Sequence, residues 1–386
     1  MTTSHTGHAP LVAETAEGCG PGCVPLFWPM MLASAVFRQG QDVVDKQLRF
    51  LEEEAKLHAI HHPQMATAHQ VRLKLRTLTL REYGKASGAH AVPTLVVAPY
   101  AGHTSVIADY YPGQSLVETL LDHGVPHVFL TDWHSASEDM KDLEIDNYLA
   151  DLCVLIDELG GRANLVGLCQ GGWISAMIAA RFPHKVQRLV LAGSPIDAGA
   201  GEGPLKQMVE RTPIRFYEDL VRTGGGLMRG SFMLQGWKNM HPDEHYFTEH
   251  VDLFQHIDDP VYLAKRETFA AWYETPIDLP GRWYLQAIRQ IFKDNLLARG
   301  QFVALGKMLD LRDITCPLYL LAGERDDITT PEQVLNAAQL VGTPSAHITQ
   351  RVVPGGHIGL FMGGRTLAEA WPQIAQWLAA PLKTGG

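Results

Sequence analysis

The sequence predicts an α/β fold with a mostly parallel central sheet, a helical cap inserted into it and a helical extension ahead of it. Short apolar strand segments alternate with helical segments over residues 67–197, and the alternation resumes over residues 306–386. This alternation is typical of parallel strands connected by helices. Between 198 and 305 the strand rhythm stops, which indicates an insertion. A chain of 386 residues is long enough for one large domain of this kind.

The first 66 residues are expected to lie outside the sheet. Residues 1–25 are small, polar and rich in proline and glycine, which predicts a disordered tail. Residues 26–66 should form an amphipathic helical extension, because apolar side chains recur every three to four positions from 26 to 57. Its opening turn is apolar nearly all round. It therefore packs on the core or on a second copy, and we expect a homodimer; the alternative is adhesion to a hydrophobic surface such as a polymer granule.

The sheet is expected to begin with an antiparallel edge hairpin over residues 71–83, where apolar and polar residues alternate. Short apolar segments then predict strands at 93–98, 128–130, 165–168, 186–191, 318–322 and 348–353. Helical spacing of apolar residues covers 113–121, 145–159 and 367–378. Because the strands are mostly parallel, functional side chains should gather just past their carboxyl ends.

The inserted segment 198–305 is rich in aromatic residues, which indicates a cap over the site. A single aromatic residue of this segment is better explained as part of the core than as a ligand contact. The large number of them, however, favours an apolar substrate tunnel. They are Phe216, Tyr217, Phe232, Trp237, Tyr246, Phe247, Phe254, Tyr262, Phe269, Trp272, Tyr273, Trp283, Tyr284 and Phe292.

Composition excludes several classes of function. The net charge of −10 and the absence of a basic run argue against a nucleic-acid partner. No run of 18 uncharged apolar residues and no apolar leader within residues 1–20 is present, so we expect a cytoplasmic protein without a transmembrane segment. The odd count of five cysteines fits a reducing compartment. Cys19 and Cys23 have no second pair to complete a metal site, and we expect neither metal nor cofactor.

The stretch from Asn164 to Trp173 organises the rest of the chain. An apolar strand runs into Gly167-Leu168-Cys169-Gln170-Gly171, and a helix of small residues follows. This is the pattern of a nucleophile elbow with cysteine in place of serine. The tight bend forces the nucleophile into a strained backbone conformation, so the residues two positions away must be nearly free of side chain. The helix that follows directs its positive dipole end at the sulfur.

The chain order Cys169, Asp326, His357 is the nucleophile, acid and base order of the α/β-hydrolase fold. Each residue stands just past a predicted strand, so all three should meet at one sheet edge. His357 would remove the thiol proton and later protonate the leaving group. Asp326 would fix the imidazole tautomer and stabilise the imidazolium. Asp327 is the alternative acid; otherwise it is a loop carboxylate that caps the next helix.

Five further positions are candidates for contact with substrate. One oxyanion amide should come from Gln170, and the other from Tyr100 or Ala101 in the loop after the first parallel strand. For His103 in the same loop there are two alternatives: its ring lines the site, or it forms a hydrogen bond with the backbone. Trp173, on the first turn of the helix, presses on the acyl pocket or packs in the core.

Two sets of motifs resemble the polyhydroxyalkanoate synthase and depolymerase superfamily. Gly-Leu-Cys-Gln-Gly-Gly at 167–172 and Pro-Gly-Gly-His-Ile-Gly at 354–359 resemble the synthases, especially the shorter two-subunit kind. The stretches 98–103, 131–133, 240–245 and 323–328 look more like intracellular depolymerases, which also carry a cysteine nucleophile. Those depolymerases typically lack the Gly-Gly after the box, whereas Gly171-Gly172 follows the synthase pattern here. A third branch of synthase-like proteins shares Cys-Gln-x-Gly-Trp and Leu-Ala-Gly-Ser-Pro.

The resemblance implies acyl transfer through a thioester on Cys169, with a polyester or hydroxyacyl substrate. We expect first a depolymerase-like hydrolase that cleaves 3-hydroxyacyl esters. The alternatives are a synthase that polymerises 3-hydroxyacyl-CoA and a non-catalytic protein that binds polymer granules. Each of the three fits a cytoplasmic, granule-associated location. Hydrolase and synthase differ mainly in what attacks the thioester, so the outcome depends on how well the cap excludes water.

Overall fold

The computed structural model describes residues 49, 63–84, 92–240, 256 and 258–381. The predicted tail 1–25 with Cys19 and Cys23, almost all of the predicted extension 26–66, and most of the motif 240–245 lie outside these residues. Across the described ranges, no helix combines the length and the apolar character that a membrane crossing requires.

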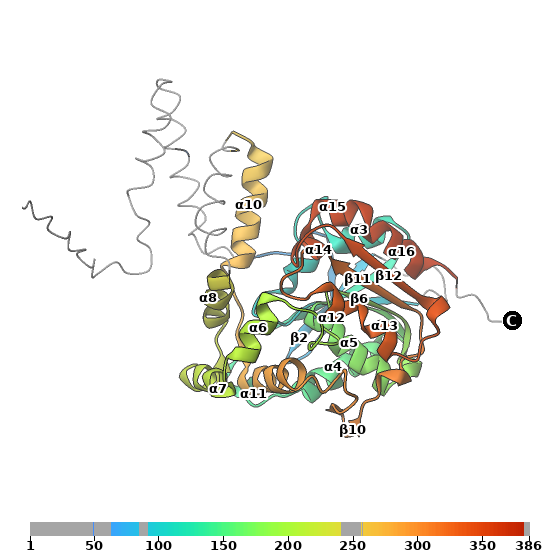
Figure 1. Ribbon diagram of the computed structural model, residues 1–386. Helices are drawn as coiled ribbons and strands as arrows, with labels where there is room; N and C mark the ends of the chain where they lie inside the picture. Colours follow the sequence, from blue (N-terminus) through green and yellow to red (C-terminus); the bar gives the residue numbers. More distant parts are fainter. Residues whose placement is uncertain (1–48, 50–62, 85–91, 241–255, 257, 382–386) are drawn as a thin grey trace, which may run out of the picture. The chain divides into compact units, whose positions relative to one another are not determined.

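An eight-stranded sheet in the order β1-β2-β4-β3-β5-β6-β11-β12 forms the centre of the fold (Figure 1). The predicted edge hairpin is present as two antiparallel strands, β1 (Gln70–Lys74) and β2 (Leu78–Gly84), and β2 also pairs antiparallel with β4. The remaining pairs are parallel. Their strands are β3 (Thr94–Val97), β4 (His127–Trp133), β5 (Ala163–Leu168), β6 (Val186–Ala192), β11 (Leu318–Gly323) and β12 (Ile348–Val353). The sheet is thus mostly parallel, as predicted.

The parallel strands end level with one another, which positions the candidate site. Val97 at the end of β3 is in register with Gly167 in β5, and Leu168 is in register with Ala192 at the end of β6. The last residues of β11 and β12, Gly323 and Val353, also pair. Residues that follow β3, β5, β11 and β12 therefore emerge at the same edge of the sheet.

Helices cover the sheet on both faces (Figure 1). α4 (Ile145–Glu158) and α5 (Gln170–Arg181) pack together, and α5, which is buried from Gly171 to Ala180, packs on β5 and β6. α3 (Leu116–Asp122), α15 (Gly364–Glu369) and α16 (Trp371–Ala379) pack together elsewhere. Between β11 and β12 the chain forms α12 (Pro331–Leu335) and α13 (Ala337–Leu340).

The prediction that a single helix covers residues 367–378 is wrong, because the structure has two helices there. α15 and α16 are separate, and Pro372 occupies the first turn of α16. Proline lacks the N–H that would continue the hydrogen-bond ladder, so a helix starts there more readily than it continues. The other end of α16 is held by the buried Arg188, whose guanidinium donates to the carbonyls of Leu378 and Ala380.

The segment 198–305 is mainly helical. It contains α6 (Pro204–Arg211), α7 (Ile214–Thr223), α8 (Gly230–Met240), α10 (Pro260–Tyr273), α11 (Gly281–Gln286) and a π-helix at Ala287–Lys293. It also includes an antiparallel pair that the sequence pattern did not show, β7 (Leu227–Met228) with β8 (Leu279–Pro280). Two-residue strands are too short to produce a recognisable alternation.

Asp197, just past β6, holds the cap against the core. Its Oδ1 accepts a hydrogen bond from Nδ2 of Asn295 at 2.7 Å, and its Oδ2 accepts one from Nδ2 of Asn336 at 3.0 Å. Asn295 follows the π-helix and has a φ of 50°, in the left-handed region that asparagine tolerates better than most residues. One carboxylate therefore joins the end of the cap helices to the end of α12.

Candidate active site

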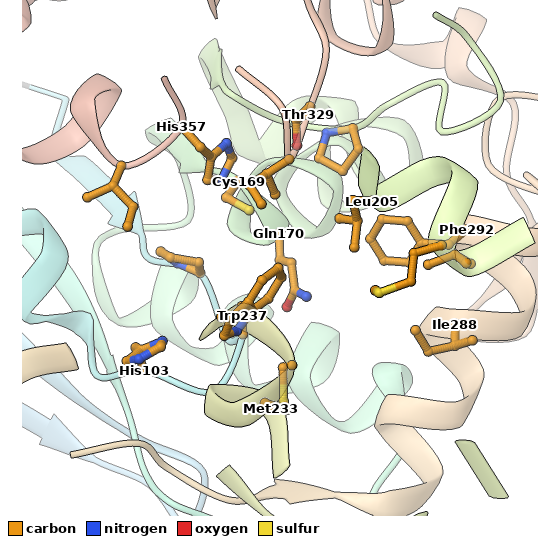
Figure 2. A pocket seen from close by; sticks show the side chains of 18 of the residues that line it. His103, Cys169, Gln170, Leu205, Met233, Trp237, Ile288, Phe292, Thr329 and His357 are labelled. Carbon is orange, nitrogen blue, oxygen red and sulfur yellow. The ribbon is translucent and has the colours of Figure 1, made fainter. Parts of the chain in front are cut away.

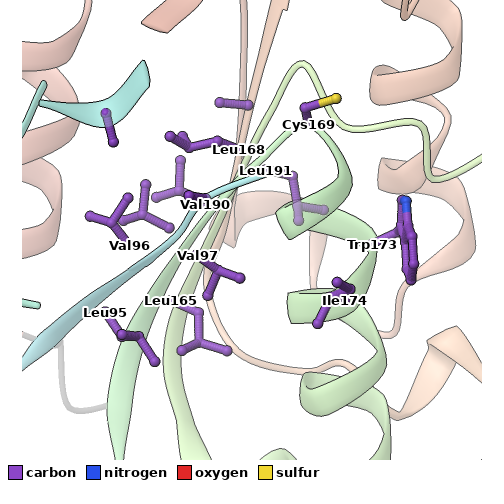
Figure 3. Packing of buried hydrophobic residues seen from close by; sticks show 14 of the residues in the cluster. Leu95, Val96, Val97, Leu165, Leu168, Cys169, Trp173, Ile174, Val190 and Leu191 are labelled. Carbon is purple, nitrogen blue, oxygen red and sulfur yellow. The ribbon is translucent and has the colours of Figure 1, made fainter. Parts of the chain in front are cut away.

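Cys169 lies at the bend between β5 and α5, with φ of 51° and ψ of −117°. Its N–H donates to the carbonyl of Ala192 on β6, and its carbonyl accepts from the N–H of Gly172. These bonds hold a conformation that a residue with a side chain adopts only under strain. Figure 3 shows the sulfur pointing away from the apolar side chains packed beneath the bend. The local geometry is therefore that of the predicted elbow.

Glycines permit the bend because other groups lie where their side chains would be. A Cβ on Gly171 would lie 2.0 Å from the carbonyl oxygen of Val97, in the backbone of β3. A Cβ on Gly172 would lie 1.8 Å from Oγ of Ser194. Both distances are far below van der Waals contact, so the start of α5 can approach β3 and β6 only without these side chains.

Gly172→Ala should destabilise the fold by about 1–3 kcal/mol, because the added methyl group overlaps a side chain in a packed region. Since the overlapping atoms belong to the side chain of Ser194, Gly172→Ala combined with Ser194→Gly should recover part of the loss. Urea denaturation of the two single variants and the double variant measures this coupling. Purely additive effects would show that the close approach at Ser194 is not what excludes alanine.

His357 and Asp326 come together from the loops after β12 and β11. Nδ1 of His357 donates to Oδ2 of Asp326 at 2.7 Å. Oδ1 of Asp326 accepts the backbone N–H groups of Ile328 and Thr329 at 3.0 and 2.8 Å, and the residue is only 4% exposed. Both carboxylate oxygens are thus engaged, and the group is fixed in place. The geometry favours Asp326 over Asp327 as the partner of the imidazole; Asp327 lines the adjacent cavity.

The other ring nitrogen of His357, Nε2, is buried and has no hydrogen-bond partner within the described part of the chain. Burial alone would lower the pKa of His357. The carboxylate of Asp326 and the sulfur of Cys169 outweigh it and hold the pKa well above the ordinary value. Cys169, His357 and Asp326 thus form one electrostatically coupled group. Because Nδ1 is hydrogen-bonded to Asp326, Nε2 is the ring nitrogen that can exchange a proton with the sulfur.

This coupling predicts a particular dependence of stability on pH. Because folding raises the pKa of His357, the protonated ring stabilises the fold fully below its ordinary pKa of about 6.5. That contribution is lost as the pH rises through the folded-state pKa. The free-energy difference of unfolding between the protein and a His357→Gln variant should therefore be largest at acidic pH and shrink on the alkaline side. Urea denaturation across a pH series measures it, and a difference that grows with pH would contradict the coupling.

Two backbone amides are placed to stabilise an oxyanion. Gln170 and Ala101 line the cavity beside Cys169. Among the described residues, no hydrogen bond is donated by the backbone N–H of either. The side chain of Tyr100 is fully buried, and its hydroxyl donates to the carbonyl of His134. The geometry therefore favours Gln170 and Ala101 over Tyr100.

A cavity of about 1130 Å³ opens beside Cys169 between the sheet edge and the cap (Figure 2). His357, Pro99 and Thr329 contribute to its wall from the core. The cap contributes aliphatic side chains and many of the predicted aromatic ones. The latter are Phe216, Tyr217, Phe232, Trp237, Phe269, Trp272, Tyr273, Tyr284 and Phe292. The chemical character of this wall suits an apolar or weakly polar substrate.

The structure separates the two remaining candidates. His103 lines the cavity, but its Nε2 donates to the carbonyl of Tyr273 at 2.9 Å and its ring stacks on that residue. Burial lowers the pKa of His103 to about 4, so the ring is neutral and joins the loop after β3 to the end of α10. Trp173 does not line the cavity. It is fully buried and stacks on Trp283 at 5.9 Å, so of the two roles considered for Trp173 the structure favours packing in the core.

Within the described ranges, no three His, Cys, Asp or Glu side chains gather as ligands of a metal ion. The sulfur, imidazole and carboxylate of Cys169, His357 and Asp326 can carry out nucleophilic acyl transfer without one.

The chain is similar to several proteins named as poly(3-hydroxyalkanoate) polymerase subunits. It is 29% identical over 327 residues to the poly(3-hydroxyalkanoate) polymerase subunit PhaC of Haloferax mediterranei, covering 83% of this chain and 65% of that protein. It is 28% identical to the PhaC subunit of Allochromatium vinosum, covering 78% of this chain and 85% of that one.

Solved structures support the fold class. The monoacylglycerol lipase of Paleococcus ferrophilus superposes with a TM-score of 0.50 at 17% identity, covering 78% of this chain and 98% of that one. This likeness and the topology of the sheet identify an α/β-hydrolase fold. A family model described as "Protein of unknown function (DUF3141)" matches residues 73–376, most of the described chain. The chain belongs to the DUF3141 family.

Proposed function

We propose that the protein is a cysteine-dependent acyltransferase that forms polyester from 3-hydroxyacyl-CoA. The observation that carries the proposal is the coupled group of Cys169, His357 and Asp326 beside a large cavity walled by apolar cap residues. The relatives described above add support, because they are named as polymerase subunits. They favour the synthase alternative over the hydrolase that the sequence motifs suggested first.

In the first half of the reaction, His357 Nε2 takes the proton of the Cys169 thiol, and the thiolate attacks the thioester carbonyl. The N–H groups of Gln170 and Ala101 stabilise the oxyanion. As the tetrahedral intermediate collapses, the C–S bond to CoA breaks, and the CoA thiolate receives the proton from His357. Asp326 holds the ring so that Nε2 faces the sulfur throughout. The acyl group is now a thioester of Cys169.

In the second half, a hydroxyl group at the end of a growing chain replaces water as the nucleophile. His357 Nε2 takes the hydroxyl proton, the oxygen attacks the acyl carbon, and the new ester forms as the thiol is regenerated with that proton. The side chains of Trp237, Phe269 and Phe292 in the wall support this outcome, because apolar side chains hold an attacking water poorly.

Hydrolysis is the second candidate, and the depolymerase-like stretches at 98–103 and 323–328 favour it. The same thioester forms from a polymer ester, an alcohol leaves, and water releases the acid. Catalytically silent granule binding is the third candidate; here Cys169→Ala would leave granule binding unchanged, and the unsubstituted protein would show no turnover.

Two parallel assays distinguish these functions. In one, the protein receives 3-hydroxybutyryl-CoA, and free CoA and insoluble polymer are both measured. In the other, it receives amorphous poly(3-hydroxybutyrate), and free 3-hydroxybutyrate is measured. Release of CoA together with polymer is the result expected. Release of 3-hydroxybutyrate from polymer, with no polymer formed from the thioester, would instead establish the hydrolase.

A further inference from the structure

Gln170, the residue after the proposed nucleophile, places an unsatisfied carboxamide in the cavity. Its Oε1 is buried and has no hydrogen-bond partner in the part of the chain that the structure describes. Figure 2 shows the side chain extending from the start of α5 into the cavity, away from His357. The backbone N–H of this residue belongs to the proposed oxyanion site, but the carboxamide has no part in that step.

A buried polar oxygen without a partner is unfavourable, so a folded protein retains one where a ligand or water satisfies it. Several other polar groups of the cavity wall are already engaged. Thr212 donates to the carbonyl of Met208, and Gln235 donates to Asn239. His103 donates to the carbonyl of Tyr273. The Oε1 of Gln170, in contrast, is a buried acceptor with no partner among the described residues, and it is available to a bound molecule.

Two hydroxyl groups of the wall, those of Thr104 and Tyr217, also have buried oxygens without a partner among the described residues. They differ from Gln170 in position, because neither is next in sequence to Cys169. An acyl group bonded to the sulfur must begin within reach of the residue that follows the sulfur. The part of the acyl group that Gln170 can contact is therefore the part nearest the thioester carbonyl.

We propose that the Gln170 carboxamide accepts a hydrogen bond from the 3-hydroxyl group of the acyl unit, which makes Gln170 a specificity-determining residue. The 3-hydroxyl is two carbons from the carbonyl carbon that Cys169 attacks. A plain acyl group of the same length brings no donor and leaves Oε1 unsatisfied. The side chain therefore selects 3-hydroxyacyl over plain acyl substrates at the acylation step. This assignment rests on the proposed function, since it requires that a thioester acylate Cys169.

The test compares 3-hydroxybutyryl-CoA with butyryl-CoA in a single turnover of the full chain. Release of CoA gives the rate, and mass spectrometry of the intact protein shows the acyl group. The unsubstituted protein should react about 10- to 100-fold faster with the hydroxylated thioester. In Gln170→Met, which keeps the length but not the acceptor, the ratio should fall to near one. Gln235→Met is the matched control, because Gln235 lines the same cavity and its Nε2 already donates to Oδ1 of Asn239; it should retain the preference.

Each alternative outcome has a distinct meaning. Gln170→Met could retain the preference for the hydroxylated thioester, or its rate could fall by the same factor with both thioesters. Either result would overturn the role assigned to the carboxamide and would leave the proposed function standing. No acylation of the unsubstituted protein by either thioester would contradict the proposed function itself. Gln170→Leu provides a second apolar replacement should the methionine variant fail to fold.

Discussion

Cys169→Ala is expected to reduce acyl transfer by on the order of 10⁴-fold or more, because it removes the thiol that forms the covalent intermediate. The side chain is 8% exposed and sits at a bend whose strained backbone an alanine can share. The fold should therefore persist while the chemistry is lost. Single-turnover release of CoA and the mass of the intact protein measure both the rate and the missing acyl group.

Cys153→Ala and Cys316→Ala are the matched controls for this loss. Burial raises the pKa of Cys316 to about 12 and also raises the pKa of Cys153, so neither thiol is a ready nucleophile. Both variants should retain activity within a few-fold. Full activity of Cys169→Ala, or covalent labelling of Cys316 by the thioester, would remove Cys169 from the mechanism.

Asp326→Asn is expected to lower the rate by on the order of 10³- to 10⁴-fold. An amide in place of the carboxylate removes the charge that raises the pKa of His357. It also allows the ring to turn or to take the other tautomer, which moves the lone pair away from the sulfur. The variant should therefore lose rate, and the acid limb of its pH–rate profile, where protonation of His357 removes the base, should move to lower pH.

Asp327→Asn is the natural comparison, because Asp327 lines the cavity while its sequence neighbour Asp326 accepts the hydrogen bond from Nδ1 of His357. We expect a loss of less than about tenfold, since a residue at the wall affects binding more than proton transfer. The same assay at several pH values measures both variants. Equal losses at 326 and 327 would show that the two carboxylates share the role.

Much of the core could be predicted from the sequence because each signal was local. Apolar runs ended by turn residues marked the strands, and strand ends in a parallel sheet place distant residues such as Cys169 and His357 at one edge. The bond between His357 and Asp326 follows from that topology. The sequence favours Asp326 over Asp327 as the acid, and in the structure Asp326 accepts the hydrogen bond from His357.

The remaining features depend on contacts between segments far apart in the chain. The bonds from Asp197 to Asn295 and Asn336 span 98 and 139 positions, and no periodicity shows them. Trp173 looked like a contact of the site because it is near Cys169 in sequence, yet one helical turn directs it into the core. The vacant hydrogen-bonding capacity of Gln170 likewise appears only when its surroundings are known.

Hydrolysis and polymerisation could not be separated at the level of residues, because both pass through the same thioester. What differs is whether water or a hydroxyl group reaches the acyl carbon, and that depends on the shape and dryness of the whole cap. Motifs of both kinds occur in this chain, so the distinction belongs to the assays described above.

Two indole rings, those of Trp237 and Trp272, form part of the cavity wall. Indole emission responds to the polarity around the ring, so the protein carries its own optical sensor of occupancy. In a Cys169→Ala background, where no turnover competes, a fluorescence titration with a 3-hydroxyacyl thioester should report entry of the ligand directly. Affinity for an intact substrate thus becomes measurable at equilibrium, without labels and apart from any reaction rate.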